Sequence, residues 1–183
     1  KGSETPFSRL LIMSVCMFTG HRLQNLPFGF NENDKRCIAL KKKLEILIRE
    51  KIEKYGVVQF LTGMELGIDC FAAEIVIDFG RKYNGISLTA VVPCREQTIR
   101  WRQCDVIRYN AILARCSNIV LLQEKYTKDC MNKRNLYMVE HSDCVIAVWN
   151  GSGSGTGNTV KYAFERGLPV TVLNPVSLKI DYR

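Results

Sequence analysis

The residues in this chain that most suggest chemistry form a glycine-rich turn at positions 150–158. Glycine lets the main chain approach an anion closely and adopt positive φ angles, and serine and threonine hydroxyls add donors. A helix that starts within the turn also presents free N–H groups. The turn is therefore a candidate phosphate cradle, with the expected ligand-binding residues Gly151, Ser152, Gly153, Ser154, Gly155, Thr156 and Asn158.

The spacing in this turn differs from two familiar phosphate-binding motifs. A P-loop needs a lysine after its last glycine, whereas Gly157 is followed by Asn158 and Thr159. The dinucleotide-binding fingerprint follows the first strand of its domain, and this turn lies far along the chain. The alternative to phosphate binding is a plain flexible connector.

A second polar turn, at residues 19–22, follows the first apolar run and supplies Thr19, Gly20, His21 and Arg22. Arginine can hold a phosphate through two parallel hydrogen bonds, so Arg22 is a candidate phosphate ligand. The alternatives are that Arg22 pairs with a surface carboxylate and that His21 is a half-buried packed ring.

A third turn, at residues 62–69, contains Thr62 and Gly63 and two carboxylates. Glu65 or Asp69 can accept hydrogen bonds from ribose hydroxyls, as acidic residues near such turns often do. Asp69 also suits the first turn of a helix, where a negative charge stabilises the helix dipole. We therefore favour Glu65 as the ribose ligand.

Polar and aromatic residues farther along add to this set. Arg134 and Asn135 lie near the start of an expected helix and can face the same ligand. Trp101 and Tyr109 lie on another expected helix, where aromatic residues usually belong to the core, although one at the rim can stack on a base.

These turns need elements to position them, and the apolar pattern predicts strands alternating with helices. The alternation indicates an α/β fold: a Rossmann-like, doubly wound, mainly parallel sheet with helices on both faces. Ligands of such sheets bind beyond the carboxyl ends of the strands, where all these turns lie. The predicted strands are 11–18, 57–61, 87–92, 118–122, 144–149 and 170–173, and the helices 34–54, 67–83, 98–116, 129–141 and 155–166.

Length and composition predict one domain over residues 1–183, with residues 1–8 as a disordered or foreign tail. The net charge of +8 favours a phosphate-bearing ligand or nucleic acid. The eight cysteines are scattered, and with only two histidines they predict no metal site and a cytoplasmic protein. No apolar run is long enough for a membrane span, and we expect no membrane partner. The polar stretch 123–133 is a candidate lid.

Taken together, these motifs resemble the YpsA-like branch of the SLOG superfamily, whose members are Rossmann-like. The resemblance implies binding of a nucleotide-derived, ADP-ribose-like ligand by a sensor or sequestering protein in stress or in conflict between phage and host. It also implies a homodimer, because related folds often pair through helices. The matching segments are 18–22, 62–69 with 72–74, Trp101 with 108–109, 134–138 with 142–143, and 151–159 with 162–163.

Two relatives imply alternative functions. LOG-type phosphoribohydrolases cleave the N-glycosidic bond of nucleoside monophosphates; Arg134 resembles their arginine, but Thr159 stands where they carry a catalytic glutamate. The resemblance thus favours binding over cleavage, with Arg134 and Glu65 as the catalytic candidates if a bond is cleaved. DprA, which binds single-stranded DNA, carries a turn like residues 63–69, but the basic residues here are dispersed, which makes nucleic acid the less favoured partner.

Overall fold

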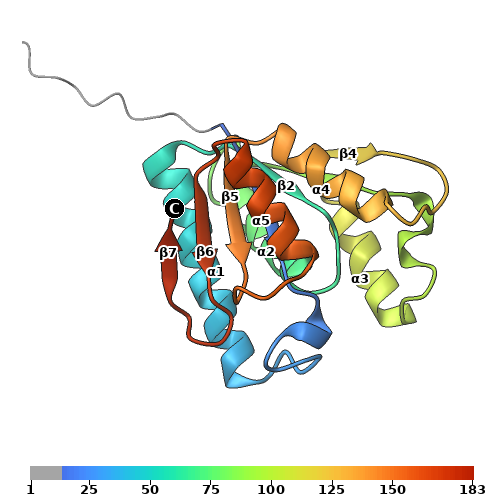
Figure 1. The fold of residues 1–183 in the computed structure, drawn as a ribbon, viewed down its shortest axis with the longest axis horizontal. Coiled ribbons are helices and arrows are strands. Elements are labelled where there is room, and N and C mark those ends of the chain that lie inside the picture. Colours follow the sequence, from blue (N-terminus) through green and yellow to red (C-terminus); the bar gives the residue numbers. More distant parts are fainter. Residues whose placement is uncertain (1–13) are drawn as a thin grey trace, which may run out of the picture.

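The computed structural model describes residues 14–183, which build a seven-stranded sheet in the order β4-β3-β2-β1-β5-β6-β7 (Figure 1). Strands β1 to β6 run parallel, and β7 pairs antiparallel with β6 at one edge. This is the predicted α/β, Rossmann-like architecture. The strands are β1 (Val15–Gly20), β2 (Gln59–Thr62), β3 (Ser87–Val92), β4 (Asn118–Leu121), β5 (Cys144–Val148), β6 (Val170–Leu173) and β7 (Ile180–Tyr182).

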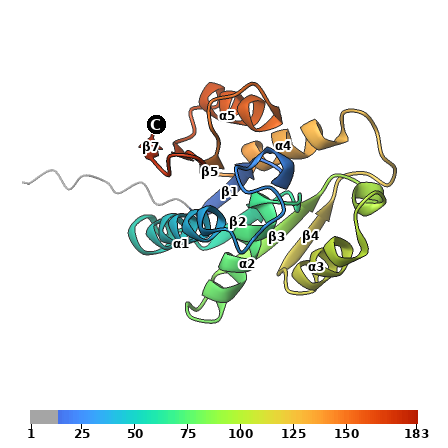
Figure 2. The same ribbon diagram turned by 90° about the horizontal axis from the view of Figure 1, so that it is seen from below.

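Helices cover both faces of the sheet, as Figure 2 shows. One face carries α1, α2 and α3, and the other carries α4 and α5. Successive residues of β1 alternate between the two apolar cores: Cys16 and Phe18 pack on one face, and Met17 packs on the other. The helices are α1 (Lys35–Tyr55), α2 (Ile68–Gly80), α3 (Gln103–Leu113), α4 (Cys130–Glu140) and α5 (Gly155–Glu165).

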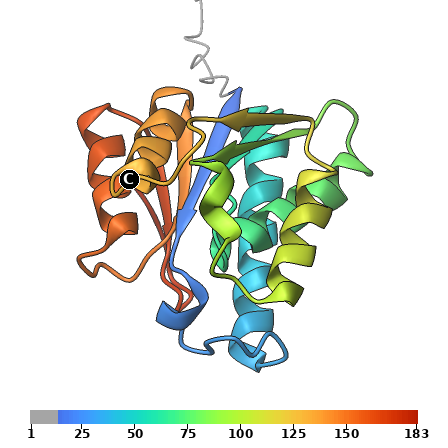
Figure 3. The ribbon, with the colours of Figure 1, turned by 90° about the vertical axis from the view of Figure 1, so that its right-hand side faces the viewer.

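The chain reverses its direction of travel across the sheet between β1 and β5. From β1 it builds outward through β2, β3 and β4, and then returns to place β5 on the other side of β1. Gly20 pairs with Val148 in this central register, so the segments that follow β1 and β5 start beside each other. Such a topological switch point opens a crevice at the carboxyl edge. Figure 3 shows β1 running to this edge, from which residues 21–34 continue to α1.

The predicted elements need correction in two places. The helix predicted over 98–116 was wrong in its first part: a short 3-10 turn (Arg95–Thr98) comes first, and α3 begins only at Gln103, after Arg102 in an extended conformation. Strand β7 was not predicted, because three residues with a charged centre give no apolar pattern. Residues 11–13 of the first predicted strand, 11–18, and the predicted tail, 1–8, lie outside the described residues.

None of the helices in residues 14–183 combines the length and the apolar character that crossing a bilayer requires.

Candidate functional site

A cavity of about 410 Å³ lies at the switch point, at the carboxyl edge of the sheet. This volume is in the usual range of small-molecule sites. Segments after β1, β2 and β5 meet there with α4. Its lining residues are Phe18, Thr19, Gly20, His21, Arg22, Gln24, Asn25, Glu65, Asp69, Met131, Arg134, Asn135, Ser154, Gly155 and Thr156.

The cavity brings together many of the predicted ligand-binding residues, which come from four distant segments of the chain. The others lie elsewhere. Thr62 and Gly63 lie beneath the cavity and position its lining residues, as described below. Gly151, Ser152, Gly153 and Asn158 do not line it, so only the second half of the glycine-rich turn faces the cavity.

That second half is the start of α5. The Ser154 hydroxyl caps the helix by accepting a hydrogen bond from the Gly157 N–H at 3.1 Å. The N–H groups of Gly155 and Thr156 have no hydrogen-bond partner among residues 14–183. Unpaired N–H groups at a helix start favour anions, and the helix dipole adds to this preference.

The first half of the turn is tied down by its own contacts. The Trp149 indole donates to the Ser152 carbonyl at 2.8 Å, and the Ser152 N–H donates to Asn150 Oδ1 at 3.1 Å. Gly151, with φ of +89°, lines a different depression next to β6 and β7. In this structure the first half of the turn therefore shapes the connection from β5 to α5.

His21 joins the two segments that flank the switch point. Its Nε2 lies 3.0 Å from Asn150 Oδ1, and the residue is only 4% exposed. Asn150 thus bonds both to His21 and to the Ser152 N–H. His21 holds the loops after β1 and β5 together at the cavity wall.

Arg22 and Glu65 form an ion pair at the cavity mouth, with Nη2 and Oε2 2.9 Å apart. The Arg22 side chain is 48% exposed and the Glu65 side chain 13%. The main chain of Arg22 bridges to Gly67, whose φ of +113° and closeness to the His21 carbonyl leave no room for a side chain. An added Cβ there would lie 2.7 Å from that oxygen.

Beneath the mouth lies a buried pair, Arg134 on α4 and Asp69 on α2. Each residue is less than a tenth exposed, and Nη1 and Oδ2 are 3.7 Å apart, too long for a hydrogen bond. Burial raises the pKa of Asp69 to about 6, and the charge of Glu65 adds to the rise while Arg134 opposes it. Asp69 Oδ2 also accepts the Glu65 N–H at 3.3 Å.

The hydrogen bonding of Arg134 is incomplete. Its Nη1 donates to the Gly63 carbonyl, but its buried Nε has no partner in the described part of the chain. Buried polar groups are nearly always paired, so such an exception marks a place where a ligand or a bound water completes the bonding. Gly63 leaves room for this guanidinium, because a Cβ at residue 63 would lie 2.0 Å from Arg134 Nη1 and displace it.

Sequence reasoning missed several residues of the site. The Gln97 amide donates at 3.2 Å to the carbonyls of Gly63 and Met64, and Tyr109 donates to Gln97 Oε1 at 3.3 Å. These residues support the turn at 62–69, in which the Thr62 hydroxyl accepts the Met64 N–H. No local pattern marks Gln97, since its partners are more than 30 residues away. The lining residues Gln24, Asn25 and Met131 also carried no motif.

Thr159, which stands at the position of the hydrolases' glutamate, lies outside the cavity lining. It is buried, and its hydroxyl donates to the Gly155 carbonyl at 2.9 Å within α5. Residues 14–183 contain no cluster of three or more His, Cys, Asp or Glu side chains that could hold a metal ion.

The chain is similar to several bacterial proteins. It is 32% identical over 138 residues to the uncharacterized SPbeta prophage-derived protein YoqJ of Bacillus subtilis, covering 69% of this chain and 81% of that one. It is 22% identical over 175 residues to the UPF0398 protein YpsA of the same organism, covering 92% and 96% of the two chains.

Solved structures of DNA processing protein A share the fold. The Helicobacter pylori protein, whose structure concerns its single-stranded DNA binding mode, aligns with a TM-score of 0.60 at 20% identity, over 91% of this chain and 68% of that one. The Streptococcus pneumoniae protein aligns with a TM-score of 0.61 at 19% identity, over 90% of this chain and about half (52%) of that one.

The family model for YpsA, described as the YspA SLOG family, matches residues 16–168. This match spans strands β1 to β5 and every segment that lines the cavity, and it ends before β6. The chain therefore belongs to the YpsA family of SLOG proteins.

Proposed function

We propose that the protein binds a phosphorylated, nucleotide-derived ligand of the ADP-ribose type in the switch-point cavity and does not cleave it. The observation that carries this proposal is that the residues of this cavity have hydrogen-bond donors without a partner in the described chain. The buried Arg134 has an unpaired Nε, and the N–H groups of Gly155 and Thr156 are free at the start of α5. These groups offer positive charge and donors, which is what a phosphate requires.

Four parts of the lining have roles in this assignment. The start of α5 and the exposed guanidinium of Arg22 bind phosphate oxygens, and Arg134 supplies positive charge from below. Glu65 lines the cavity and binds Arg22 through Oε2, and its Oε1 has no hydrogen-bond partner in residues 14–183, so Oε1 can accept hydrogen bonds from ribose hydroxyls. The similarity to a prophage-derived protein supports a role as sensor or sequestering protein in conflict between phage and host.

The geometry favours binding over hydrolysis. Cleavage of an N-glycosidic bond needs a carboxylate that is free to act on the sugar or on water. Of the two carboxylates that line the cavity, Glu65 is paired with Arg22, and Thr159 hydrogen bonds within its own helix. The remaining carboxylate, Asp69, lies below the mouth beside Arg134.

Thermal unfolding with AMP and with ADP-ribose tests the proposal. A ligand that binds only the folded state at 100 times its Kd stabilises the protein by about 2.7 kcal/mol, which raises the melting temperature by several degrees. We expect this rise with at least one of the two nucleotides, and no free base or ribose phosphate after prolonged incubation. No shift with either nucleotide at millimolar concentration would refute the binding proposal, and release of base would replace it with hydrolysis.

Single-stranded DNA is the second candidate ligand. The shared fold with DNA processing protein A and the net charge of +8 favour it. This candidate predicts that an oligonucleotide is retarded at low salt and released as the salt concentration rises, since phosphate contacts release counterions. An oligonucleotide that migrates freely at 20–50 mM salt, a range of low ionic strength, would eliminate it.

A further inference from the structure

A second cavity, of about 570 Å³, adjoins the first. Arg22, Glu65 and Met131 line both cavities, so the Arg22–Glu65 ion pair stands at their junction. The second cavity has a more apolar lining than the first, and it takes in the 3-10 turn before α3 and the connection from β4 to α4. Its other lining residues are Glu96, Gln97, Ile99, Arg100, Trp101 and Tyr126.

One wall of the second cavity is held rigidly. Trp101 is half-buried and packs edge-on against Tyr109, with ring centroids 5.5 Å apart and an interplanar angle of 88°. Tyr109 is in turn fixed by its hydrogen bond to Gln97, the residue that supports the turn beneath the first cavity. An aromatic wall that is ordered in advance costs little entropy when a ring binds to it.

The lining of the second cavity also presents large apolar groups to solvent. Ile99 is 75% exposed and Tyr126 is 57% exposed. The segment that carries Tyr126 is nevertheless ordered, because the Tyr126 N–H donates to Glu96 Oε2 at 2.8 Å and the Gln123 amide donates to Thr127 Oγ1 at 2.8 Å. Exposed apolar groups gathered beside a polar cavity mark a binding surface, and aromatic ones suit a flat ring.

The junction between the cavities offers guanidinium donors beside the Glu65 carboxylate. The guanidinium of Arg22 has a single hydrogen-bond partner in residues 14–183, Glu65, and is about half exposed, so it retains free donors. Arg100, in the second cavity, forms no ion pair within the described chain. Free guanidinium donors between two cavities fit a phosphate linkage that passes from one to the other.

We propose that the second cavity binds the base of a second nucleotide unit, joined by a phosphate linkage to the unit in the first cavity. The proposal rests on the proposed function, because the first unit must occupy the switch-point cavity. The base stacks among Trp101, Tyr126 and Ile99, and the linkage lies along Arg22. The ligand class is therefore two nucleoside units joined through phosphate, either as a pyrophosphate-linked dinucleotide or as adjacent nucleotides of a single strand.

Calorimetric titration with AMP, NAD and the phosphodiester dinucleotide pApA tests this. Stacking of one more base is expected to make at least one two-base probe bind at least tenfold more tightly than AMP. In the variants Tyr126→Ala and Ile99→Ser, the two-base probe should bind less than threefold more tightly than AMP. The affinity of each variant for AMP should stay within a factor of two of the wild-type value. Ile107→Ser is the matched control, because Ile107 is 60% exposed on α3 but lines neither cavity.

Tryptophan fluorescence locates the second base directly. The chain has two tryptophans, so the variant Trp149→Phe leaves Trp101 as its single indole. Binding of a two-base probe should quench or shift the emission of Trp101, whereas AMP should leave it unchanged.

The possible outcomes separate this inference from the proposed function. A gain with NAD alone supports a free dinucleotide, and a gain with pApA alone supports a strand of nucleic acid. Equal affinity for all three probes, or a gain that survives both variants, would overturn the second subsite and leave nucleotide binding intact. Failure of all three probes to bind would overturn both proposals.

Discussion

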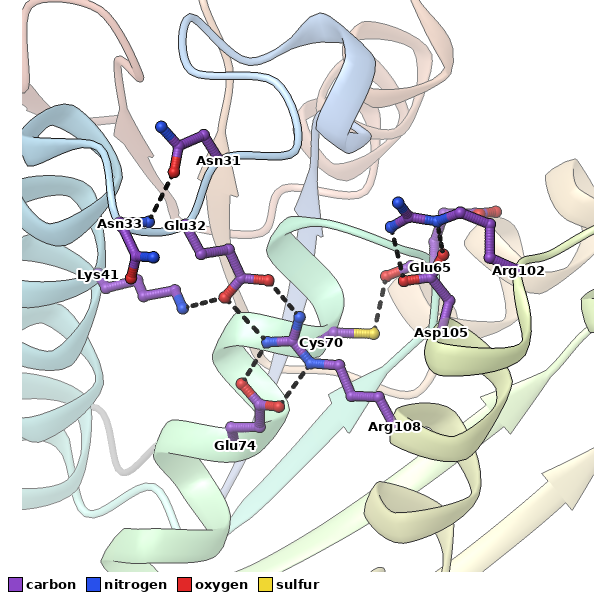
Figure 4. A network of polar contacts seen from close by, with 10 residues as sticks. All are labelled: Asn31, Glu32, Asn33, Lys41, Glu65, Cys70, Glu74, Arg102, Asp105 and Arg108. Atoms are coloured by element: carbon purple, nitrogen blue, oxygen red, sulfur yellow. Dashed lines mark hydrogen bonds and ion pairs between the residues drawn. The ribbon is translucent and has the colours of Figure 1, made fainter.

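Two arginines, Arg108 and Arg134, are each placed among helices and carboxylates, yet their surroundings differ in completeness. Arg108 on α3 donates from Nε and Nη2 to Glu74 of α2, both at 2.7 Å, and from Nη1 to Glu32 (Figure 4). Lys41 of α1 also donates to Glu32. Arg134, by contrast, has one carbonyl partner, one distant carboxylate and an unpaired Nε.

This difference separates an arginine that stabilises the fold, Arg108, from one that is available to a ligand, Arg134. The Arg108 network ties residues 31–34 to three helices, and so anchors the segment that follows Arg22 (Figure 4). Glu74 and Glu32 accept four of the five N–H donors of Arg108. Arg134 is more deeply buried but less well bonded, and buried charge with unmet hydrogen bonds is costly unless something else completes it. The predictions below test this contrast.

The largest effect is expected for Arg134→Met. We expect nucleotide affinity to fall at least a hundredfold, because a positive charge and its donors are lost from beneath the phosphate. Removing one partner of a buried pair also costs about 3–5 kcal/mol of stability. The loss should be smaller at pH 5 than at pH 8, since Asp69 can then take up a proton. Calorimetry and urea unfolding measure both quantities.

Lys133→Met is the matched control for Arg134→Met. Lys133 is the preceding residue of α4, but its side chain is 56% exposed and pairs with Asp129 at the surface. Its loss should change stability by less than about 1 kcal/mol. Equal effects of the two variants would show that Arg134 acts only through net charge.

The pH dependence of stability should reveal Asp69. Its pKa is about 6 in the folded protein against an ordinary value of 3.8, so the folded state binds the proton more tightly than the unfolded state. This contribution is fully present below pH 4 and is lost as the pH rises through 6. Relative to Asp69→Asn, the wild type should lose about 2–3 kcal/mol between pH 4 and pH 7, at about 1.36 kcal/mol per pKa unit. Urea unfolding of both proteins across this pH range measures the difference. Parallel curves of unfolding free energy against pH would contradict a raised pKa of Asp69.

Arg108→Met should affect stability rather than binding. The loss of charge-assisted hydrogen bonds to half-exposed carboxylates costs about 1–3 kcal/mol. Nucleotide affinity should change less than threefold, because the network lies outside the cavity lining. Arg115→Met, which breaks a surface pair at 3.9 Å, should have a much smaller effect on unfolding. A large loss of affinity in Arg108→Met would mean that the two arginines do not have separate roles.

Gly63→Ala should have the smallest but most specific effect. The new methyl group would lie 2.0 Å from Arg134 Nη1 and displace the flexible end of that side chain. We expect about a tenfold loss of nucleotide affinity, about 1.4 kcal/mol, with a stability change below about 1 kcal/mol. Gly80→Ala is the control, since its Cβ would meet only the Ile86 carbonyl at an ordinary 3.5 Å. Unchanged nucleotide affinity in Gly63→Ala would show that nucleotide binding does not depend on the position of the Arg134 guanidinium.

Much of the fold could be predicted from local patterns. The bounds of β3 and β6 match the prediction, because both strands are short apolar runs with clear ends. Helix α1 was predicted within one residue at each end, since its apolar stripe lies between Asp34 as N-cap and Gly56 in the left-handed conformation. The start of α3 was wrong because Trp101 and Arg102 fit a helical pattern but take part in a turn, where Trp101 packs against Tyr109.

The candidate site was only partly accessible from the sequence. The turns at 19–22 and 62–69 and the start of α5 are visible as motifs, because glycine, hydroxyl and charged residues gather where strands end. The burial of a side chain could not be predicted from such motifs. Arg134 looks like any other helical arginine in the sequence, and only the packing of α4 against the turn at 62–69 makes it buried and incompletely bonded.

The sequence by itself determined the alternation of strands and helices, the polar turns at the strand ends and the family. These are local properties, set by periodicity and by residue type. Tertiary structure alone decided that β5 pairs with β1, which places Gly155 and Thr156 beside Arg22 across more than a hundred residues of chain. It also decided that Trp101 and Tyr126 line the same cavity. Strand order and side-chain burial arise from contacts between distant segments, and no local pattern encodes them.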